Sequence, residues 1–212
     1  MTFDLEALAR ADGVRPARQA RSEATLERLL DAAEELFAAQ GVDGTSMAAV
    51  ATAGRSSIGS LYTRFPDKTA LVRAVQLRVV RRLFGAVADG LSVGDPPAAQ
   101  PAAELVAALV STLARGILGQ AGLLRAIIVS GVSDPVMRER IGLALDDATH
   151  RLADGLRACD DVAHPDPEVA ADLIVRMVTG ALQQLVVLDR PMDVDQLVAE
   201  LTQAACAYLQ RR

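Results

Sequence analysis

The sequence predicts an all-α protein, and three observations support this expectation. The 212 residues are 51% apolar, which is enough for a well-buried core in one or two domains. Aromatic residues make up only 3%, whereas Ala and Leu are abundant, and this composition favours closely packed helices over sheets. Apolar side chains also recur at helical spacing through most of the chain, between Pro, Gly and Asp residues that mark helix boundaries.

The first strong helical pattern runs from about Ser22 to Gln40. Gly41 follows it, at the place where a residue with positive φ commonly ends a helix. The preceding residues 1–21 form a flexible N-terminal arm in which Asp4 to Arg10 can form a short helix. This arm is either a terminus without a partner or a basic segment that follows a phosphate backbone or enters a minor groove. The apolar residues of the 22–40 helix fall on one stripe: Leu26, Leu30, Ala33 and Phe37.

A short helix over residues 47–53 comes next, and either Thr45 or Ser46 can cap it. It consists almost entirely of Ala, Val and Met. At about two turns it is too short to be stable without packing partners. Its alanines allow another helix to approach closely.

A tight turn at Gly54 and Arg55 leads to a third helix, which also has about two turns and ends near Thr63. Either Ser56 or Ser57 can cap it. Two short helices joined by a tight turn, after a longer supporting helix, predict a helix-turn-helix motif.

A long helix from Lys68 to about Ala88 follows, and Asp67 can cap its start. Lys68 is the only lysine in the sequence. It lies at the start of this helix, where free backbone N–H groups also favour an anion.

The loop from Gly90 to Pro101 is the clearest break in the chain, and five further helical patterns come after it. The helix over 135–159 has a narrow apolar stripe, whereas apolar residues cover more than half of the helix over 167–188. A helix this apolar must be covered on several sides, so a second subunit is a natural cover. The five patterns are Pro101–Leu118, Ala121–Gly131, Pro135–Cys159, Pro167–Leu188 and Asp193–Gln210. The narrow stripe consists of Ile141, Leu145, Ala148, Leu152 and Leu156, and the broad one of Leu173, Ile174, Met177, Val178, Ala181, Leu182, Leu185 and Val186.

Charge is distributed unevenly along the chain. The net charge is −5, yet residues 15–82 hold 11 basic and 7 acidic side chains, and residues 83–212 hold 10 and 17. This asymmetry indicates a basic region that can bind a polyanion, joined to an acidic body.

Residues 26–75 resemble the DNA-binding domain of the TetR family of transcriptional regulators, without a gap. One position departs from the family pattern, because Arg55 stands where the family has Gly in the turn. Either Arg55 adopts the positive φ itself or Gly54 takes over with a shifted turn. The residues that carry the resemblance are Ala32, Ala33, Leu36, Phe37, Gly41, Thr45, Val50, Ala51, Gly59, Ser60, Leu61, Tyr62, Phe65, Pro66, Lys68, Leu71 and Val75.

The resemblance implies a fold, a domain organisation and an activity. The expected fold is an N-terminal three-helix helix-turn-helix domain, joined by a long helix to a C-terminal helical ligand-binding and dimerisation domain. We expect the arm at 1–21, the DNA-binding domain at 22–68 and the effector-binding and dimerisation domain at 69–212. The expected activity is that of a homodimeric repressor on a near-palindromic double-stranded DNA operator, released by a small-molecule effector. The homodimer would form through the helices at about 135–159 and 167–188.

The DNA contacts follow from the motif and from side-chain chemistry. Small residues near the start of the third helix would let its backbone approach the major groove, and Ile58 could contact a thymine methyl group. By resemblance, Tyr62 donates its hydroxyl group to a phosphate, while Thr45 and Lys68 hold flanking phosphates. The complete expected set is Thr45, Arg55, Ser56, Ser57, Ile58, Gly59, Ser60, Tyr62, Thr63, Arg64 and Lys68.

For the effector, only polar residues on apolar helices offer a hint, and each can also be an ordinary surface or satisfied core residue. The residues chosen as an effector pocket are Thr112, Arg125, His150, Arg176 and Gln183. No catalytic residue, metal site or cofactor is expected. There is no phosphate-cradling Gly-rich loop and no nucleophile elbow, and two distant histidines are too few ligands for a metal ion.

Compartment and partners complete the expectations. Cys159 and Cys206 are expected to be reduced, buried thiols of a cytosolic protein. The N-terminus lacks a signal-peptide pattern, and apolar runs stop short of the roughly 20 residues that a membrane span needs. We therefore expect a cytoplasmic protein without a membrane partner. The alternative to a DNA-binding regulator is a dimeric helical interaction protein that no longer reads DNA, which the irregular turn at Gly54 and Arg55 would favour.

Overall fold

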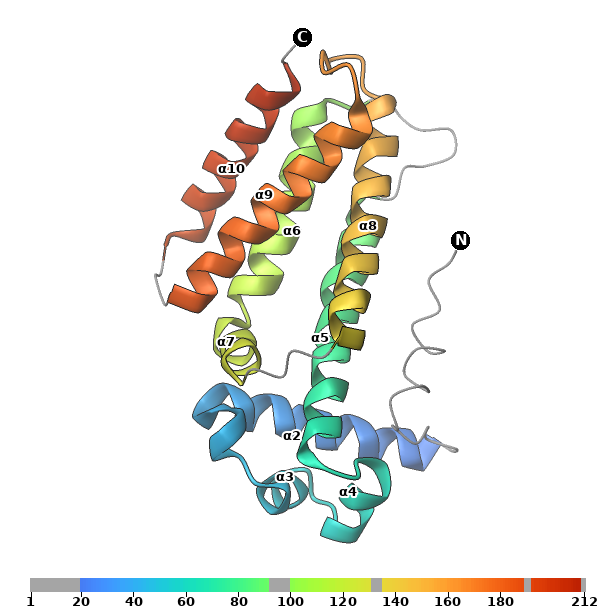
Figure 1. Cartoon of the computed structure of the whole chain (residues 1–212), viewed down its shortest axis with the longest axis vertical. Helices are drawn as coiled ribbons and strands as arrows, with labels where there is room; N and C mark the ends of the chain where they lie inside the picture. Colours follow the sequence, from blue (N-terminus) through green and yellow to red (C-terminus); the bar gives the residue numbers. More distant parts are fainter. Residues whose placement is uncertain (1–19, 92–99, 131–134, 189–191, 211–212) are drawn as a thin grey trace. The chain divides into compact units, whose positions relative to one another are not determined.

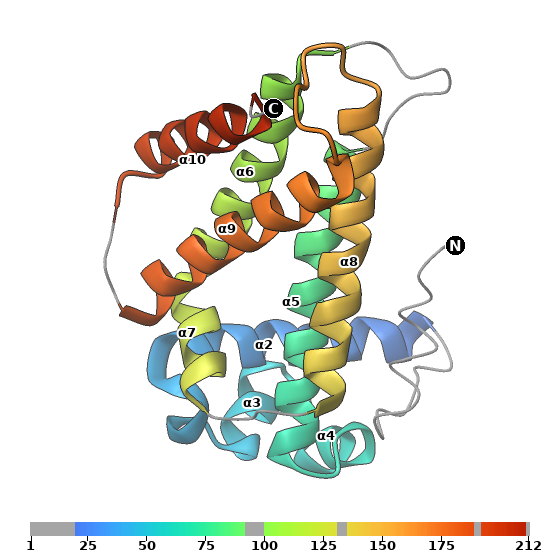
Figure 2. The same cartoon turned by 45° about the horizontal axis from the view of Figure 1, so that its top comes forward.

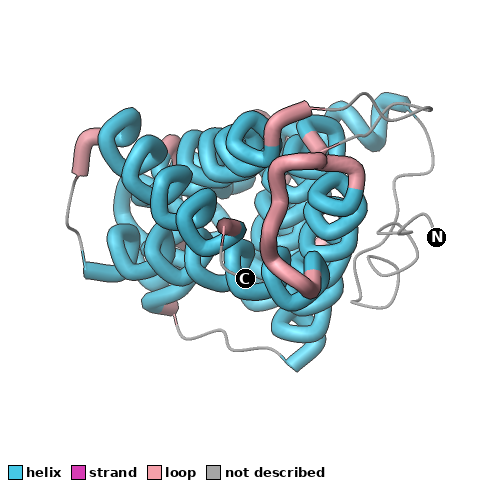
Figure 3. The backbone as a smooth tube through the Cα atoms, turned by 90° about the horizontal axis from the view of Figure 1, so that it is seen from above, coloured by secondary structure: helices cyan, strands magenta, loops and turns pink. Residues whose placement is uncertain are grey.

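The all-α fold class is confirmed in the computed structural model, which describes residues 20–91, 100–130, 135–188 and 192–210. Every regular element in these ranges is a helix (Figure 3). The possible short helix at residues 4–10 lies outside the described residues. The helices are α2 (Ala20–Gly44), α3 (Met47–Ala53), α4 (Ile58–Arg64), α5 (Lys68–Gly90), α6 (Ala102–Leu118), α7 (Ala121–Val129), α8 (Pro135–Arg157), α9 (Pro167–Leu188) and α10 (Val194–Leu209).

The helices form two compact units. Unit 1 consists of residues up to Arg81 together with Gln120–Met137, and unit 2 consists of Arg82–Gly119 and Arg138–Arg212. Unit 1 therefore contains the whole 22–68 range expected for a DNA-binding domain. It also contains the first part of α5 and all of α7, which were predicted to lie in the second domain, at 69–212.

In unit 1, α2 lies between α3 and α7 (Figure 1). The apolar stripe expected on α2 is buried apart from Leu26, which is partly buried, and Phe37 and Ala33 are fully inaccessible to solvent. Leu123 and Ile127 of α7 belong to the same core cluster. Burial of apolar surface in this shared core thus stabilises α3 and α4, which are too short to be stable alone.

An ion-pair cluster joins α5 to α2 within this unit. The guanidinium group of Arg78 lies 3.4 Å from a carboxylate oxygen of Glu27 and 3.5 Å from one of Glu34, and it also donates a hydrogen bond to Asp31. These three acids are spaced at i, i+4 and i+7 and so share one face of α2. One cation thereby holds the middle of α5 against the helix that supports α3 and α4.

In unit 2, α6 packs against both α9 and α10, and α9 also contacts α10 (Figure 2). Glycine allows α8 to approach α6 closely, because a Cβ atom built on Gly155 would lie only 2.6 Å from Leu105 Cδ2. The loop after α8 is tied to the other helices. Its Asp161 carboxylate accepts a hydrogen bond from the N–H of Ala102 at the start of α6, at 3.0 Å, and its backbone carbonyl accepts one from Gln210 Nε2 at 2.8 Å.

The apolar faces of α8 and α9 differ from the predicted ones. At the start of α8, Arg140 is buried with 1% exposure, while Ile141, expected in the stripe, is 38% exposed. On α9 the buried face includes Ile174, Val178 and Leu182, but Leu173 is 47% exposed. Apolar composition alone therefore identified these helices correctly, but it did not fix which apolar residues face the interior.

The length and composition of α9 would allow it to cross a membrane, in contrast to the expectation from uninterrupted apolar runs. The bent pair α6 and α7 passes the same test of length and composition. In the structure, one side of α9 is buried within unit 2, and its remaining apolar residues are half-buried or exposed. Its high hydropathy thus reflects apolar residues on two sides of one helix.

Candidate nucleic-acid interface

The cap of α3 is Ser46, whose hydroxyl oxygen accepts a hydrogen bond from the N–H of Ala49 at 3.1 Å. Thr45, the other predicted cap, is only 2% exposed. Its hydroxyl group donates to the carbonyl oxygen of Gly41 at 2.8 Å. The buried side chain of Thr45 therefore stabilises the loop between α2 and α3. It does not lie on the surface, where a phosphate would bind.

The turn between α3 and α4 settles the question raised by Arg55. Arg55 has φ 50°, whereas Gly54 has φ −74° and ψ 7°. The N–H of Ser56 donates to the carbonyl oxygen of Ala51 at 2.9 Å, and the N–H of Arg55 donates to that of Thr52 at 3.1 Å. This is the Schellman pattern of helix ends, with Arg55 at the left-handed position that glycine usually occupies. The alternative, in which Gly54 takes the positive φ, is wrong.

Gly54 is required for a different reason, which is lack of space. A Cβ atom built on Gly54 would lie 2.9 Å from Leu29 Cδ2 and 3.2 Å from the carbonyl oxygen of Arg28. Both atoms belong to α2, so the end of α3 packs directly against the backbone of the supporting helix. The two neighbouring residues of the turn thus have separate roles: Gly54 permits close packing, and Arg55 reverses the chain.

Ser57 caps α4, because its hydroxyl oxygen accepts a hydrogen bond from the N–H of Ser60 at 3.1 Å. One side of α4 is buried through Leu61, and Phe65 follows it into the core. The opposite side is exposed, with Tyr62 49% and Ile58 43% accessible to solvent. The exposed residues on and beside this side are Arg55, Ser57, Ile58, Gly59, Tyr62 and Thr63.

Two further residues of the expected DNA-binding set, both cationic, donate hydrogen bonds within the protein. Arg64 Nη2 donates to the backbone carbonyl oxygen of Ser22 at 2.9 Å and to its hydroxyl oxygen at 2.7 Å. Lys68 Nζ donates to the carbonyl oxygen of Asp43 at 3.2 Å. These bonds join residues 42 and 25 positions apart, and nothing in the local sequence pattern indicated them. Ser22 and Asp43 are therefore parts of the site that sequence reasoning missed.

Replacing Arg55 by glycine should stabilise unit 1. The left-handed conformation costs a non-glycine residue about 1–2 kcal/mol, and the greater backbone entropy of glycine in the unfolded chain offsets about 0.5–1 kcal/mol of the gain. We expect Arg55→Gly to raise the free energy of unfolding by about 0.5–1 kcal/mol, measured by urea denaturation. Arg55→Ala loses the same charge but keeps the strain, so it should show no such gain. Equal stabilities of the two variants would contradict a strained turn.

The five residues expected to line an effector pocket are not brought together. His150, Arg176 and Gln183 are exposed on α8 and α9, and Arg176 forms an ion pair with Asp172 at 2.8 Å. The carbonyl oxygen of Asp146, 2.6 Å from His150 Nδ1, and the nearby charge of Glu168 raise the pKa of His150. Thr112 is half-buried on α6 in unit 2, and Arg125 is half-buried on α7 in unit 1.

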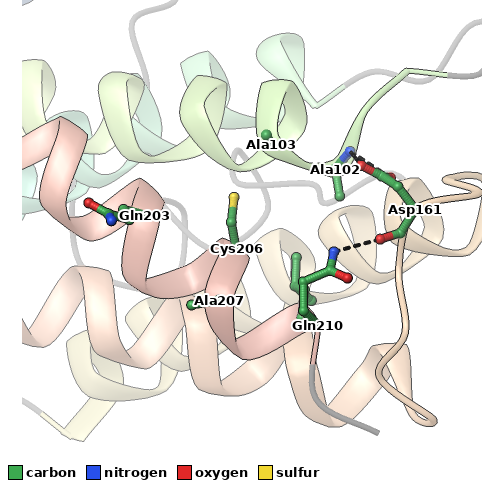
Figure 4. A pocket seen from close by; sticks show the side chains of 8 residues that line it. Ala102, Ala103, Asp161, Gln203, Cys206, Ala207 and Gln210 are labelled. Atoms are coloured by element: carbon green, nitrogen blue, oxygen red, sulfur yellow. Dashed lines mark hydrogen bonds between the residues drawn. The ribbon is translucent and has the colours of Figure 1, made fainter.

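A cavity of about 300 Å³ does lie in unit 2, between α6 and α10 (Figure 4). Alanines of both helices, Cys206 and the side chains of Gln203 and Gln210 line it, and none of the five expected pocket residues does. Cys206 points from α10 toward α6 and is partly exposed, whereas Cys159 is buried as expected. Burial raises the pKa of both thiols, which lowers their reactivity.

Two family models match the chain. One, described as bacterial regulatory proteins of the tetR family, matches residues 29–75. The other, described as a tetracyclin repressor-like C-terminal domain, matches residues 101–209. Among relatives, the HTH-type transcriptional regulator UidR of Escherichia coli strain K12 is 25% identical over 162 residues, which are 75% of this chain and 78% of UidR.

Solved structures share the fold. The TetR family transcriptional regulator PfmR from Thermus thermophilus has a TM-score of 0.63 and 21% identity, over 87% of this chain and 100% of PfmR. A transcriptional regulator from Cytophaga hutchinsonii has a TM-score of 0.69 and 19% identity, over 88% of this chain and 98% of that one.

Proposed function

This chain belongs to the TetR family of bacterial DNA-binding transcriptional regulators, and we propose that it acts as a homodimeric repressor which a small-molecule effector releases from a near-palindromic operator. The observation that carries the DNA-binding part is the exposed side of α4. On this side, Gly59 keeps the backbone accessible, Ile58 is an exposed apolar side chain that can contact a thymine methyl group, and Tyr62 is an exposed hydroxyl donor. The opposite side of α4 is held in the core by Leu61. A helix of this kind suits the major groove.

The homodimer proposal rests on α8 and α9. Ile141 and Leu143 of α8 are 38% exposed, and on α9 Val169, Leu173 and Val187 are 40–53% exposed. Residues 169, 173, 180 and 187 lie close to one line along α9, and Gly180 on this line has no neighbouring atom within 4 Å of a built Cβ position. Covering this face of α9 with the same face of a second copy would remove Val169, Leu173 and Val187 from water and give an isologous dimer. Two copies of α4 would then meet successive major grooves about 34–36 Å apart.

The effector proposal concerns unit 2. A ligand can release the operator only if it binds more tightly to a dimer whose α4 spacing does not fit DNA. Thr112 is half-buried on α6, whose buried residues are all apolar, and its hydroxyl group supports a ligand site along this helix. We place the protein in the cytoplasm, where its DNA lies.

The alternative of an interaction protein without DNA binding relied on an irregular turn, and the ordered hydrogen bonds of the turn at Arg55 remove that support.

Selection of DNA from a random-sequence library, followed by footprinting, tests this proposal. We expect the chain to select a near-palindromic duplex and to protect two half-sites about one helical turn apart. Failure of the folded dimer to select any duplex at moderate salt would overturn it.

The hydroxyl group of Tyr62 provides a sharper variant. Tyr62→Phe should lower the affinity for the selected duplex and for unrelated duplexes alike, because a phosphate contact carries no sequence information. A hydrogen bond to a charged group contributes about 1.5–3 kcal/mol, so we expect a loss of at least tenfold. Tyr208→Phe makes the same chemical change on α10 of unit 2 and should leave the affinity unchanged. If Tyr62→Phe and Tyr208→Phe bind DNA with equal affinity, the hydroxyl group of Tyr62 does not contact a phosphate.

A further inference from the structure

The cavity between α6 and α10, called the α6–α10 cavity below, lies between the first residues of α6 and the last turns of α10 in unit 2 (Figure 4). Its apolar surface includes Ala103 on α6, Ala207 on α10 and Leu209, which is fully buried. The two alanines leave space because their side chains end at Cβ. At about 300 Å³ the cavity is at the lower end of the range for small-molecule sites, which are mostly apolar with a few polar groups. It can therefore hold a small organic molecule.

Two polar side chains meet at one end of the α6–α10 cavity, those of Asp161 and Gln210, while Gln203 lies at the opposite end and Cys206 lies between (Figure 4). The Asp161 carboxylate accepts a hydrogen bond from the N–H of Ala102, at 3.0 Å from one oxygen and 3.2 Å from the other. A carboxylate has about four lone-pair sites, so it can accept further hydrogen bonds. Gln210 Nε2 donates to the backbone carbonyl oxygen of Asp161 at 2.8 Å, which holds the Gln210 amide at the same end.

Asp161 gives the α6–α10 cavity a negative potential. Of the described residues that line the cavity, Asp161 is the only charged one, and no described cation forms an ion pair with it. The charge acts across the cavity on Cys206: burial raises the pKa of this thiol, and the Asp161 carboxylate raises it further. A charge that disfavours a thiolate favours a cation in the same place. The cavity therefore suits a ligand with a positive charge and disfavours an anion.

We propose that the α6–α10 cavity is a binding site for a small organic ammonium ion, whose nitrogen lies against the Asp161 carboxylate and whose apolar body lies on the alanines and Leu209. A primary ammonium group has three N–H donors, and the Asp161 carboxylate and the Gln210 amide oxygen are acceptors at one end of the cavity. The inference deepens the effector part of the proposed function by naming a ligand class. It rests on that function for the consequence of binding, and not for binding itself.

Three probes of similar shape test the charge preference: 2-phenylethylammonium, 2-phenylethanol and 3-phenylpropanoate. They share a phenyl ring on a two-carbon chain and differ in the charge of the end group. An NMR titration of the full chain measures their affinities, and a ligand with about nine non-hydrogen atoms suits a Kd on the order of 1 mM. The ammonium should bind about tenfold or more tightly than the carboxylate, because attraction to Asp161 becomes repulsion, and the alcohol should lie between. Equal affinity of the three probes, or no binding of the ammonium, would overturn the proposal.

Asp161→Asn tests the assigned charge, because it removes the charge and keeps an acceptor for the N–H of Ala102. It should weaken the ammonium by about fivefold and strengthen the carboxylate, so that the two bind with similar affinity. An unchanged preference for the ammonium in this variant would show that Asp161 does not select the ligand. Arg211→Gln/Arg212→Gln removes the two cations that follow Gln210 in the sequence, and it should bind the ammonium at least as tightly as the wild type. Weaker binding by that variant would contradict a cation site.

Filling the cavity tests its position. Ala207→Leu places a larger side chain in the space between α6 and α10 and should abolish binding of the ammonium. Ala204→Leu makes the same change at an exposed position of α10 that does not line the cavity, and it should bind like the wild type. Leucine is close to alanine in helix propensity, so both variants should stay folded. Equal affinities of the two variants would place the ligand outside the α6–α10 cavity.

The thiol of Cys206 reports occupancy of the cavity directly. Cys206 is partly exposed and can be alkylated by iodoacetamide, whereas the buried Cys159 serves as the internal reference. At about ten times Kd, about nine-tenths of the sites are occupied, so 2-phenylethylammonium should slow the alkylation of Cys206 by about fivefold to tenfold. The same concentration of 3-phenylpropanoate should leave the rate unchanged. Binding of the ammonium without protection of Cys206 would overturn the proposal.

Failure of the inference can be told apart from failure of the proposed function. If the chain selects no duplex but binds the ammonium with protection of Cys206, the regulator proposal is wrong and the ligand site stands. If a duplex is selected and the ammonium does not bind, or binds without protecting Cys206, only the assignment of the α6–α10 cavity is wrong.

Discussion

Phe65→Ala is expected to destabilise strongly the compact unit that carries α3 and α4. The Phe65 side chain is fully buried, directly after the last turn of α4, and belongs to one core cluster with Leu61 and Leu71. Truncating a buried phenylalanine to alanine costs about 3–5 kcal/mol, through lost burial and the cavity left behind. Domains of this size have a total stability of about 5–15 kcal/mol, so a large part of it would be lost.

Urea unfolding followed by circular dichroism measures this effect. Tyr62→Ala is the matched control, because it truncates an aromatic side chain three residues earlier that is 49% exposed. We expect its unfolding free energy to stay within about 1 kcal/mol of the wild-type value. A Phe65→Ala protein that unfolds at the wild-type urea concentration would show that the packing of α4 on the core is not what the structure indicates.

Gly59→Leu is expected to abolish specific DNA binding while leaving the protein folded. A Cβ atom built on Gly59 meets nothing within 4 Å, so a leucine is accommodated in the free protein. Leucine also favours the helix over glycine, by about 0.8–1.0 kcal/mol. In a complex, the added side chain would occupy the space between α4 and the base edges. Overpacking of a fitted interface costs about 1–3 kcal/mol per site, so two subunits should lose roughly a hundredfold or more in affinity.

Gly85→Leu provides the comparison for this prediction. Gly85 is also an exposed helical glycine with an open Cβ position, but it lies on the part of α5 that belongs to unit 2. Both variants should melt at or above the wild-type temperature, and only Gly59→Leu should fail to shift the selected duplex in a gel. Normal binding by Gly59→Leu would mean that this side of α4 does not enter the groove.

The sequence predicted the helices well because their determinants are local. Asp67 was expected to start α5, and its carboxylate accepts a hydrogen bond from the N–H of Ala70 at 2.7 Å. For α3 and α4, two neighbouring hydroxyl residues could each serve as the cap, and the sequence left both pairs open. The structure selects Ser46 and Ser57. That choice depends on how the residues before each helix pack against the rest of the protein, and a local sequence pattern does not carry this information.

The candidate site was less predictable, because its remaining parts depend on contacts between distant residues. The burial of Thr45, the bond from Arg64 to Ser22 and the bond from Lys68 to Asp43 all depend on how the ends of α2 meet α4 and α5. The polar residues picked on α8 and α9 illustrate a second limit. A shift of one residue rotates a side chain by about 100° around a helix, so composition could not tell an inward Arg176 from an outward one.

The single lysine of this protein gives the surface proposed to bind DNA a reactive group that no other side chain of the sequence has. Lys68 Nζ is held by the Asp43 carbonyl group beside α4, and no other side chain in the sequence carries a primary amine. Amine-directed reagents therefore have one side-chain target in the whole chain, at the surface proposed to meet DNA. A mass shift on the peptide that contains Lys68 would report occupancy of that surface directly, and acylation of this one amine would remove a positive charge where a phosphate is expected.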